Sequence, residues 1–191
     1  DHILRVVHLA ENFAENEKCN KTIVVLSALL HDADDYKLFG DKNQKELTNT
    51  NKILLEIGAS TRIKEQVLEI VATIGYSKRL KGIKPKTIEG KIVSDADMCD
   101  ALGAQGILRT QQYILKHNKP FFDKDIFPNE NLTAESYKKD CADTGVVHLF
   151  EKMLKLKDLM FTQSGKKEAL IRHNFVVNFL KELFYEENAS N

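Results

Sequence analysis

The chain has 191 residues, enough for one domain with a sizeable core, and its 28 Lys and Arg balance 28 Asp and Glu. A formal net charge of zero excludes a generally basic coat for nucleic acid, although a local patch could still bind phosphates. The three cysteines, Cys19, Cys99 and Cys141, have no CxxC spacing, so neither a disulfide framework nor a thiolate zinc site is expected. Reduced thiols, with no signal-peptide or membrane-spanning pattern, predict a cytoplasmic protein.

The hydrophobic pattern at the start of the chain is helical. Residues 3–14 carry apolar side chains three and four positions apart, as an amphipathic helix does. Residues 23–30 are apolar almost all round, which indicates a helix buried in the middle of a bundle and leading directly into His31. The polar stretch from Tyr36 to about Thr48 is expected to be a loop.

The same helical pattern continues to the end of the chain. Further helices are expected over residues 53–57, 63–74, 87–99, around 109–113, and over 146–156 and 169–184. No alternating strand pattern competes, and no internal repeat or linker divides the chain. The sequence therefore predicts an all-α, single-domain helical bundle over residues 1–191. The chain begins abruptly in what looks like a first helical turn, so a few upstream residues are expected to be missing.

The stretch LLHDADD, residues 29–35, places an imidazole beside a carboxylate at the end of the buried helix. Such donors suit Mn, Fe, Co, Ni or Zn, whereas a buried His–Asp ion pair is the structural alternative, and these residues alone do not decide. A mononuclear site needs roughly four to six donors, so others must come from other helices. His2, Asp95 and Asp97 are the candidates. Asp95 and Asp97 lie about 200° apart on a helix and cannot both face one ion.

Four blocks of sequence, in order, resemble the HD-domain superfamily of metal-dependent phosphohydrolases, whose signature is H…HD…D on separate helices. They are HILRV at residues 2–6, ALLHD at 28–32, EGKIVSDAD at 89–97 and DALGAQGILR at 100–109. Residues 156–166 also resemble the C-terminal signature of the subgroup that includes bacterial nucleoside triphosphate pyrophosphohydrolases. The resemblance implies the helical bundle of that superfamily and a hydrolytic activity.

The resemblance also assigns the ligands of one divalent metal ion, with Mn, Co, Ni, Fe or Mg as candidates. These ligands are His2, His31, Asp32 and Asp97. Asp97 is preferred to Asp95 because more distant branches of the superfamily share an Ala-Asp pair at this place. Asp95 is then expected to pair with a nearby Lys or Arg.

Asp35 lies three residues after Asp32, so both carboxylates share a face if the helical turn continues. Related HD hydrolases carry an acidic residue at this spacing, and the resemblance implies that Asp35 and Asp32 are catalytic. Asp35 would orient the attacking water or take its proton. The alternative is that Asp34 and Asp35 only end the helix or cap the loop that follows.

Four basic residues are candidates for binding substrate phosphates, namely Lys37, Arg109, Lys166 and Arg172, although such residues are more often solvated or salt-bridged. Lys37 ranks first because it closely follows Asp32. Two positions depart from the subgroup pattern. Met98 stands where an Arg is usual, and Gln105, a smaller departure, where an apolar residue is usual. If the usual Arg contacts substrate phosphate or stabilises the site, this chain is expected to use another cation or a different substrate.

The expected function is metal-dependent hydrolysis of a nucleotide, with release of pyrophosphate from a (deoxy)nucleoside triphosphate as first choice. The metal would lower the pKa of a water for in-line attack and neutralise a phosphoryl oxygen. A nucleotide monophosphate phosphatase is the enzymatic alternative. A catalytically weak metal- or nucleotide-binding module is the other, kept open by Met98. The expected partner is a small phosphorylated substrate, with no nucleic acid or membrane partner, and a homodimer is an open alternative.

Overall fold

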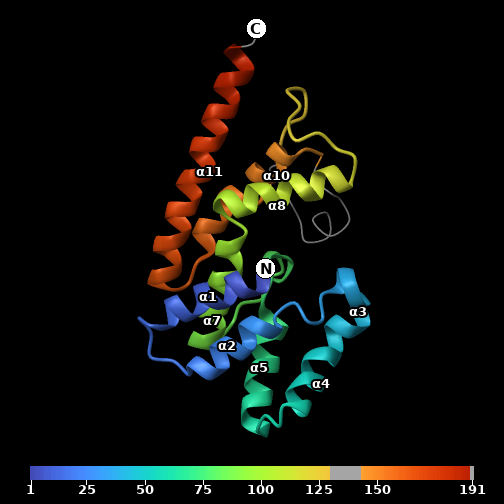
Figure 1. Ribbon diagram of the computed structural model, residues 1–191, viewed down its shortest axis with the longest axis vertical. Helices are drawn as coiled ribbons and strands as arrows, with labels where there is room; N and C mark the ends of the chain where they lie inside the picture. The colour runs from blue at the N-terminus through green and yellow to red at the C-terminus, as the bar shows by residue number, and fades with distance from the viewer. Residues whose placement is uncertain (130–142, 190–191) are drawn as a thin grey trace. The chain divides into compact units, whose positions relative to one another are not determined.

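The computed structural model describes residues 1–129 and 143–189, and every regular element within them is a helix (Figure 1). This confirms the predicted all-α class. The chain forms two compact units, residues 1–97 and 98–191, each described by itself below. Cys141 lies outside the described residues. Among the described helices, none has both the length and the apolar character that a bilayer-spanning segment needs.

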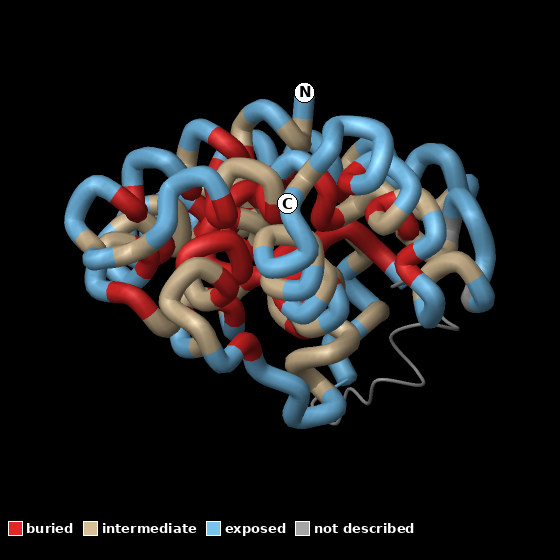
Figure 2. Tube along the Cα trace, turned by 90° about the horizontal axis from the view of Figure 1, so that it is seen from below, coloured by how far each residue is buried: buried red, intermediate tan, exposed pale blue. Residues whose placement is uncertain are grey.

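The first unit is built from six helices and most of a seventh. They are α1 (His2–Ala14), α2 (Lys21–Leu30), α3 (Tyr36–Glu46), α4 (Thr48–Glu56), α5 (Thr61–Thr73), α6 (Tyr76–Leu80) and α7 (Ile88–Asp100). Helix α2 packs against α1 and α5, and α4 packs against α5. Apolar side chains on the facing sides are buried, and Figure 2 shows buried and exposed stretches following one another along the helices. This alternation is what the amphipathic sequence pattern predicts.

Helix α2 is the buried helix predicted over residues 23–30, and Val24 and Ala28 have no exposed surface. Its N-terminus is capped by Asn20, whose side chain accepts hydrogen bonds from the backbone N–H groups of Thr22 and Ile23. The helix ends at Leu30, and residues 31–34 continue as hydrogen-bonded turns. His31 therefore stands at the exact junction between a buried helix and a turn.

The prediction of a loop from Tyr36 to about Thr48 is wrong, because this stretch is helical. Helix α3 covers most of it, and α4 begins at Thr48. Residues such as Leu, Lys, Gln and Glu favour helix even where the apolar period is weak. Gly40 adopts a non-helical conformation with φ of 82° and ψ of 165°, so the glycine marks a kink between two helical segments rather than a loop.

Within residues 98–129 and 143–189, the second unit contains the end of α7 and four further elements. They are α8 (Gly103–Lys116), α10 (Gly145–Glu151), the 3₁₀ helix η1 (Met153–Leu159) and α11 (Gln163–Ala189). Helix α11 packs on α8 and η1, and α10 packs on η1 and α8. The single helix predicted over residues 146–156 is wrong, since α10 and η1 are separated at Lys152. The 3₁₀ helix aligns residues three apart, and it buries Met153 and Leu156 together.

Candidate metal centre

Four polar side chains from three helical segments of the first unit converge on one point. His2 lies in the first turn of α1, and its Nε2 is 3.2 Å from Nε2 of His31 at the end of α2. The Asp32 Oδ2 atom is 3.5 Å from both of these nitrogens. The Asp97 Oδ1 atom, on α7, is 3.5 Å from the His2 nitrogen and 3.6 Å from the His31 nitrogen. The structure thus brings together all four residues that the resemblance proposed as ligands.

The cluster has a buried side and an open side. The His31 side chain is 1% exposed, whereas that of Asp32 is 43% exposed. The His31 Nδ1 atom lies 2.8 Å from the main-chain oxygen of Ala28, one turn earlier on α2. Because a carbonyl only accepts hydrogen bonds, Nδ1 carries a proton, and Nε2 is the ring nitrogen that faces the cluster and offers a lone pair when the ring is neutral. Metal-binding histidines are oriented in this way.

The carboxylates hold positive charge at His31. Burial by itself lowers the pKa of His31, but the hydrogen bond and charge of Asp97, together with the charge of Asp32, raise this pKa to about 9. In the absence of a cation the cluster therefore binds a proton. A divalent cation would take the place of that proton, because imidazole ligands bind metal in the neutral form.

The spacing of the donor atoms fits a divalent transition metal. Two ligands each about 2.0–2.2 Å from one ion lie about 3.0–3.5 Å apart in octahedral or tetrahedral coordination. The separations of 3.2 Å between the imidazole nitrogens and 3.5 Å from imidazole nitrogen to carboxylate oxygen are close to these values. Mixed imidazole and carboxylate donors suit Mn, Fe, Co, Ni and Zn. A His–Asp ion pair alone would not require two imidazole nitrogens to face each other.

Asp95 and Asp97 have different surroundings, although they are two residues apart on α7. Asp97 joins the cluster, and Asp95 is completely buried. Burial lowers the pKa of Arg79, and the charge of Asp95 acts in the opposite direction, which places the two side chains near each other. The rotation of about 200° between positions 95 and 97 accounts for the difference.

Asp34 and Asp35 follow the cluster in the turn after α2. Asp34 is buried, and its carboxylate accepts hydrogen bonds from Asn49 and Thr50 at the start of α4. The sequence alternative was that Asp34 ends the helix or caps the loop that follows, whereas these contacts cap α4, a helix further along the chain. The Asp35 N–H donates to the Asp32 oxygen at 3.1 Å, so the continuing α-helical turn expected here is a tighter three-residue turn.

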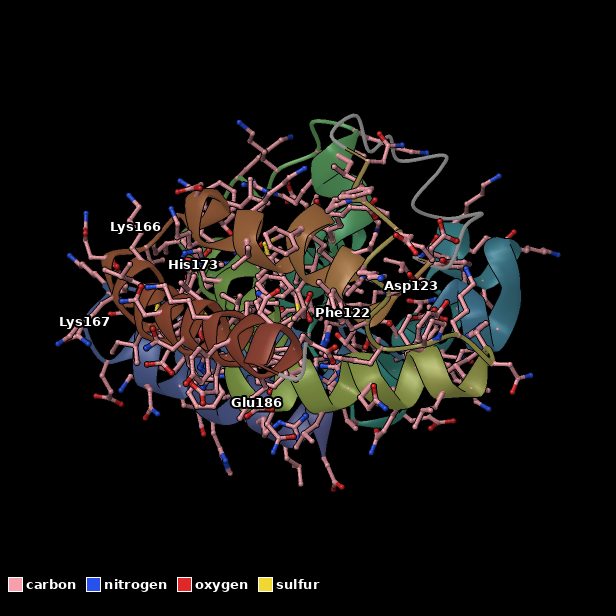
Figure 3. The ribbon with its side chains drawn as sticks, turned by 90° about the horizontal axis from the view of Figure 1, so that it is seen from above. Phe122, Asp123, Lys166, Lys167, His173 and Glu186 are labelled. Carbon is pink, nitrogen blue, oxygen red and sulfur yellow. The ribbon has the colours of Figure 1, made fainter. Side chains whose placement is uncertain are left out.

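The four basic residues proposed for phosphate binding are divided between the two units, with Lys37 in the first and Arg109, Lys166 and Arg172 in the second. The side chain of Lys37 lies outside the described part of the structure. Arg109, on α8 of the second unit, has Nη1 2.9 Å from Oδ2 of Asp100, whose side chain has no exposed surface. Lys166 is exposed in the first turn of α11, also in the second unit (Figure 3).

The two departures from the subgroup pattern have structural settings that suit the residues present. Met98 is only 3% exposed, so an arginine there would need a buried partner for its charge. Gln105 is exposed on α8, where a polar side chain remains hydrated. Arg172, the fourth basic candidate, lies on α11 of the second unit. Its guanidinium donates to the Cys99 main-chain oxygen at 3.0 Å and so satisfies a carbonyl at the end of α7.

Comparison with known proteins identifies the family to which this geometry belongs. The HD domain pattern matches residues 1–102, which include all four residues of the cluster. This chain belongs to the HD domain family. The Bacillus subtilis protein YpgQ is 31% identical to it over 183 residues, which are 95% of this chain and 80% of YpgQ.

Solved structures similar to this chain match it over nearly its whole length. An HD-superfamily hydrolase from Bacillus thuringiensis is 34% identical with a TM-score of 0.76, covering 98% of this chain and 85% of that one. A Lactobacillus plantarum protein has a TM-score of 0.84 at 29% identity, covering 99% and 86%. A structure of YpgQ in complex with ADP has a TM-score of 0.74 at 27% identity, covering 97% and 84%.

Proposed function

We propose that this HD protein is a metal-dependent phosphohydrolase that releases pyrophosphate from a (deoxy)nucleoside triphosphate. The observation that carries the proposal is the convergence of two imidazoles and two carboxylates at ligand spacing. The choice of a nucleotide is supported by the similarity to YpgQ, which was solved with ADP. The choice of pyrophosphate as the product is supported by the resemblance of the sequence blocks to the pyrophosphohydrolase subgroup.

In this proposal His2, His31, Asp32 and Asp97 hold one divalent ion. When bound, the ion supplies a water of lowered pKa and a positive charge that neutralises a phosphoryl oxygen. The protein fixes the direction of the His31 lone pair through the Ala28 carbonyl. Asp32, the most exposed of the four, faces the open side, where the substrate phosphates would enter. This arrangement presents the buried donors from one side and leaves the other side for substrate.

Asp35 is the proposed general base. A hydrogen bond from the Asp35 N–H to the Asp32 oxygen closes the turn between these residues, and this supports a base near the attacking water. Its carboxylate would take the proton of the attacking water. Lys37 is the proposed phosphate-binding residue nearest in sequence to this turn, and Arg109 and Lys166 remain predictions from the resemblance.

The test is a product analysis with defined substrates and metals. The protein is stripped with a chelator and reloaded with Mn, Co, Ni or Mg, then incubated with the common nucleoside and deoxynucleoside triphosphates and monophosphates. Pyrophosphate and orthophosphate are measured separately. Pyrophosphate from a triphosphate, lost in the His31→Ala variant, is expected. Orthophosphate from a monophosphate would instead indicate a phosphatase, and nucleotide binding without turnover would indicate a binding module.

A further inference from the structure

The buried acidic residue Asp34 connects the turn that follows α2 to the start of α4. Asp34 is 3% exposed, and both of its carboxylate oxygens accept hydrogen bonds. Oδ1 accepts from the Asn49 N–H at 2.8 Å, and Oδ2 accepts from the Thr50 N–H at 2.9 Å. The Thr50 hydroxyl donates to the same Oδ2 at 2.7 Å. The Asn49 side-chain amide completes the contact by donating to the Ala33 oxygen at 2.9 Å.

These partners are the N–H groups that a helix cannot satisfy by itself. Asn49 and Thr50 are the second and third residues of α4, where a capping side chain normally accepts hydrogen bonds. The residue at the cap position is Leu47, which has no polar side chain to offer. Asp34, some fifteen positions earlier in the chain, supplies the missing cap. We call these four hydrogen bonds the Asp34 cap.

The backbone before α4 is adapted to this contact. Leu47 adopts the left-handed conformation, with φ of 50° and ψ of 47°, which is unfavourable for a residue with a branched side chain. Such a conformation persists where surrounding contacts determine it. Leu47 is itself buried, and the two residues that bind Asp34 follow it closely. The Asp34 cap is therefore a specific contact rather than an incidental one.

We infer that Asp34 is a positioning residue, which holds the turn of His31 and Asp32 in the geometry that the metal cluster needs. His31 follows the end of α2, and Asp32 lies in the hydrogen-bonded turn beyond the regular helix. The Asp34 cap attaches this turn to α4 at two successive residues, Ala33 and Asp34. Asp34 does not contact the ion in this inference, which rests on the proposed metal binding.

The test measures Mn²⁺ affinity rather than turnover. Chelator-treated wild type, Asp34→Asn and Thr50→Val are titrated with Mn²⁺ by calorimetry, and thermal unfolding is recorded on the same samples. Asp34→Asn replaces an acceptor oxygen by an amide donor that faces backbone donors, and Thr50→Val removes one hydrogen bond and keeps the shape. Loss of a group that supports a ligand weakens metal binding by about 10–100-fold. We expect a loss of this size for Asp34→Asn and a smaller one for Thr50→Val.

Asn20→Ala is the matched control. It removes the same kind of cap, two hydrogen bonds to backbone N–H groups, from the opposite end of the helix that leads to His31. We expect it to lower the unfolding temperature and to leave the Mn²⁺ affinity within about twofold. If Asn20→Ala weakens Mn²⁺ binding as much as Asp34→Asn, general stability is responsible and the inference is wrong.

The other outcomes are equally distinct. Wild-type affinity in folded Asp34→Asn would overturn the inference and leave the proposed function intact. If Asp34→Asn does not fold, Thr50→Val decides, and an affinity equal to wild type would then overturn the inference. Absence of Mn²⁺ binding by wild type would instead contradict the proposed function, on which the inference depends.

Discussion

The turn after α2 and the last part of α7 each supply the cluster with one carboxylate and bury a second one two residues away. Asp32 and Asp97 join the cluster, whereas Asp34 caps α4 and Asp95 lies near Arg79. The difference lies in the backbone. On α7 the helical rotation of about 200° separates the two roles by itself. In the turn, long-range hydrogen bonds do so. The helix itself sets the direction of Asp97, whereas the turn that carries Asp32 is held by hydrogen bonds to residues distant in the sequence.

The largest effect is expected from removing the helical ligand. Asp97→Ala deletes one donor and much of the negative charge around His31, so bound metal should fall from about one per chain to background, and activity with it. Metal content is measured by mass spectrometry on protein purified with and without added Mn²⁺, with Asp95→Ala as the companion variant. Metal retained by Asp97→Ala and lost by Asp95→Ala would mean that the two roles are reversed.

The next effect concerns the turn and its proposed base. Asp35→Asn keeps the shape of the side chain but removes its basicity, so kcat should fall by roughly 10²–10⁴, the usual contribution of general acid–base catalysis. Metal stoichiometry and thermal unfolding, measured on the same preparation, should stay near those of wild type. Near-normal kcat would exclude Asp35 as the base, and loss of metal as well would make Asp35 a ligand.

Asp95→Ala should reduce stability rather than metal binding. It removes a fully buried carboxylate and the opposite charge that this carboxylate supplies to Arg79, and losing a buried polar interaction costs about 1–3 kcal/mol. The free energy of unfolding is measured by urea titration on metal-free protein, so that bound metal does not contribute. Stability within about 0.5 kcal/mol of wild type would show that the charge of Asp95 has no such role.

The smallest effect is expected at the far end of α2. Asn20→Ala should lower the free energy of unfolding by about 1 kcal/mol, the typical value of an N-terminal cap. Urea titration gives this value, and the rate of pyrophosphate release should stay unchanged. A large loss of activity would show that the whole of α2, and not only the turn beyond it, sets the position of His31.

The sequence predicted the features that depend on helical periodicity within a single segment. The apolar run of α2 and the angular separation of Asp95 from Asp97 follow from helical periodicity, and the ordered HD blocks indicated which side chains should converge. The helix at Tyr36–Glu46 was missed because its apolar period is weak. The break at Lys152 was missed because the apolar period continues across it. The contact of Asp34 with Thr50 depends on where α4 begins, which no local pattern reveals.

The hydrogen bond that orients His31 does not depend on the identity of the residue that accepts it. The acceptor that orients His31 is the main-chain oxygen of Ala28, and every amino acid supplies that atom. Substitutions at position 28 are therefore limited by the space around a fully buried side chain and not by hydrogen bonding. A substitution at position 28 keeps the hydrogen bond that orients the His31 ring, whereas the Asp34 cap requires particular side chains at positions 34, 49 and 50. The orientation of His31 should therefore tolerate substitution at position 28. The turn that carries Asp32 should tolerate substitution less well at positions 34, 49 and 50, whose side chains form the Asp34 cap.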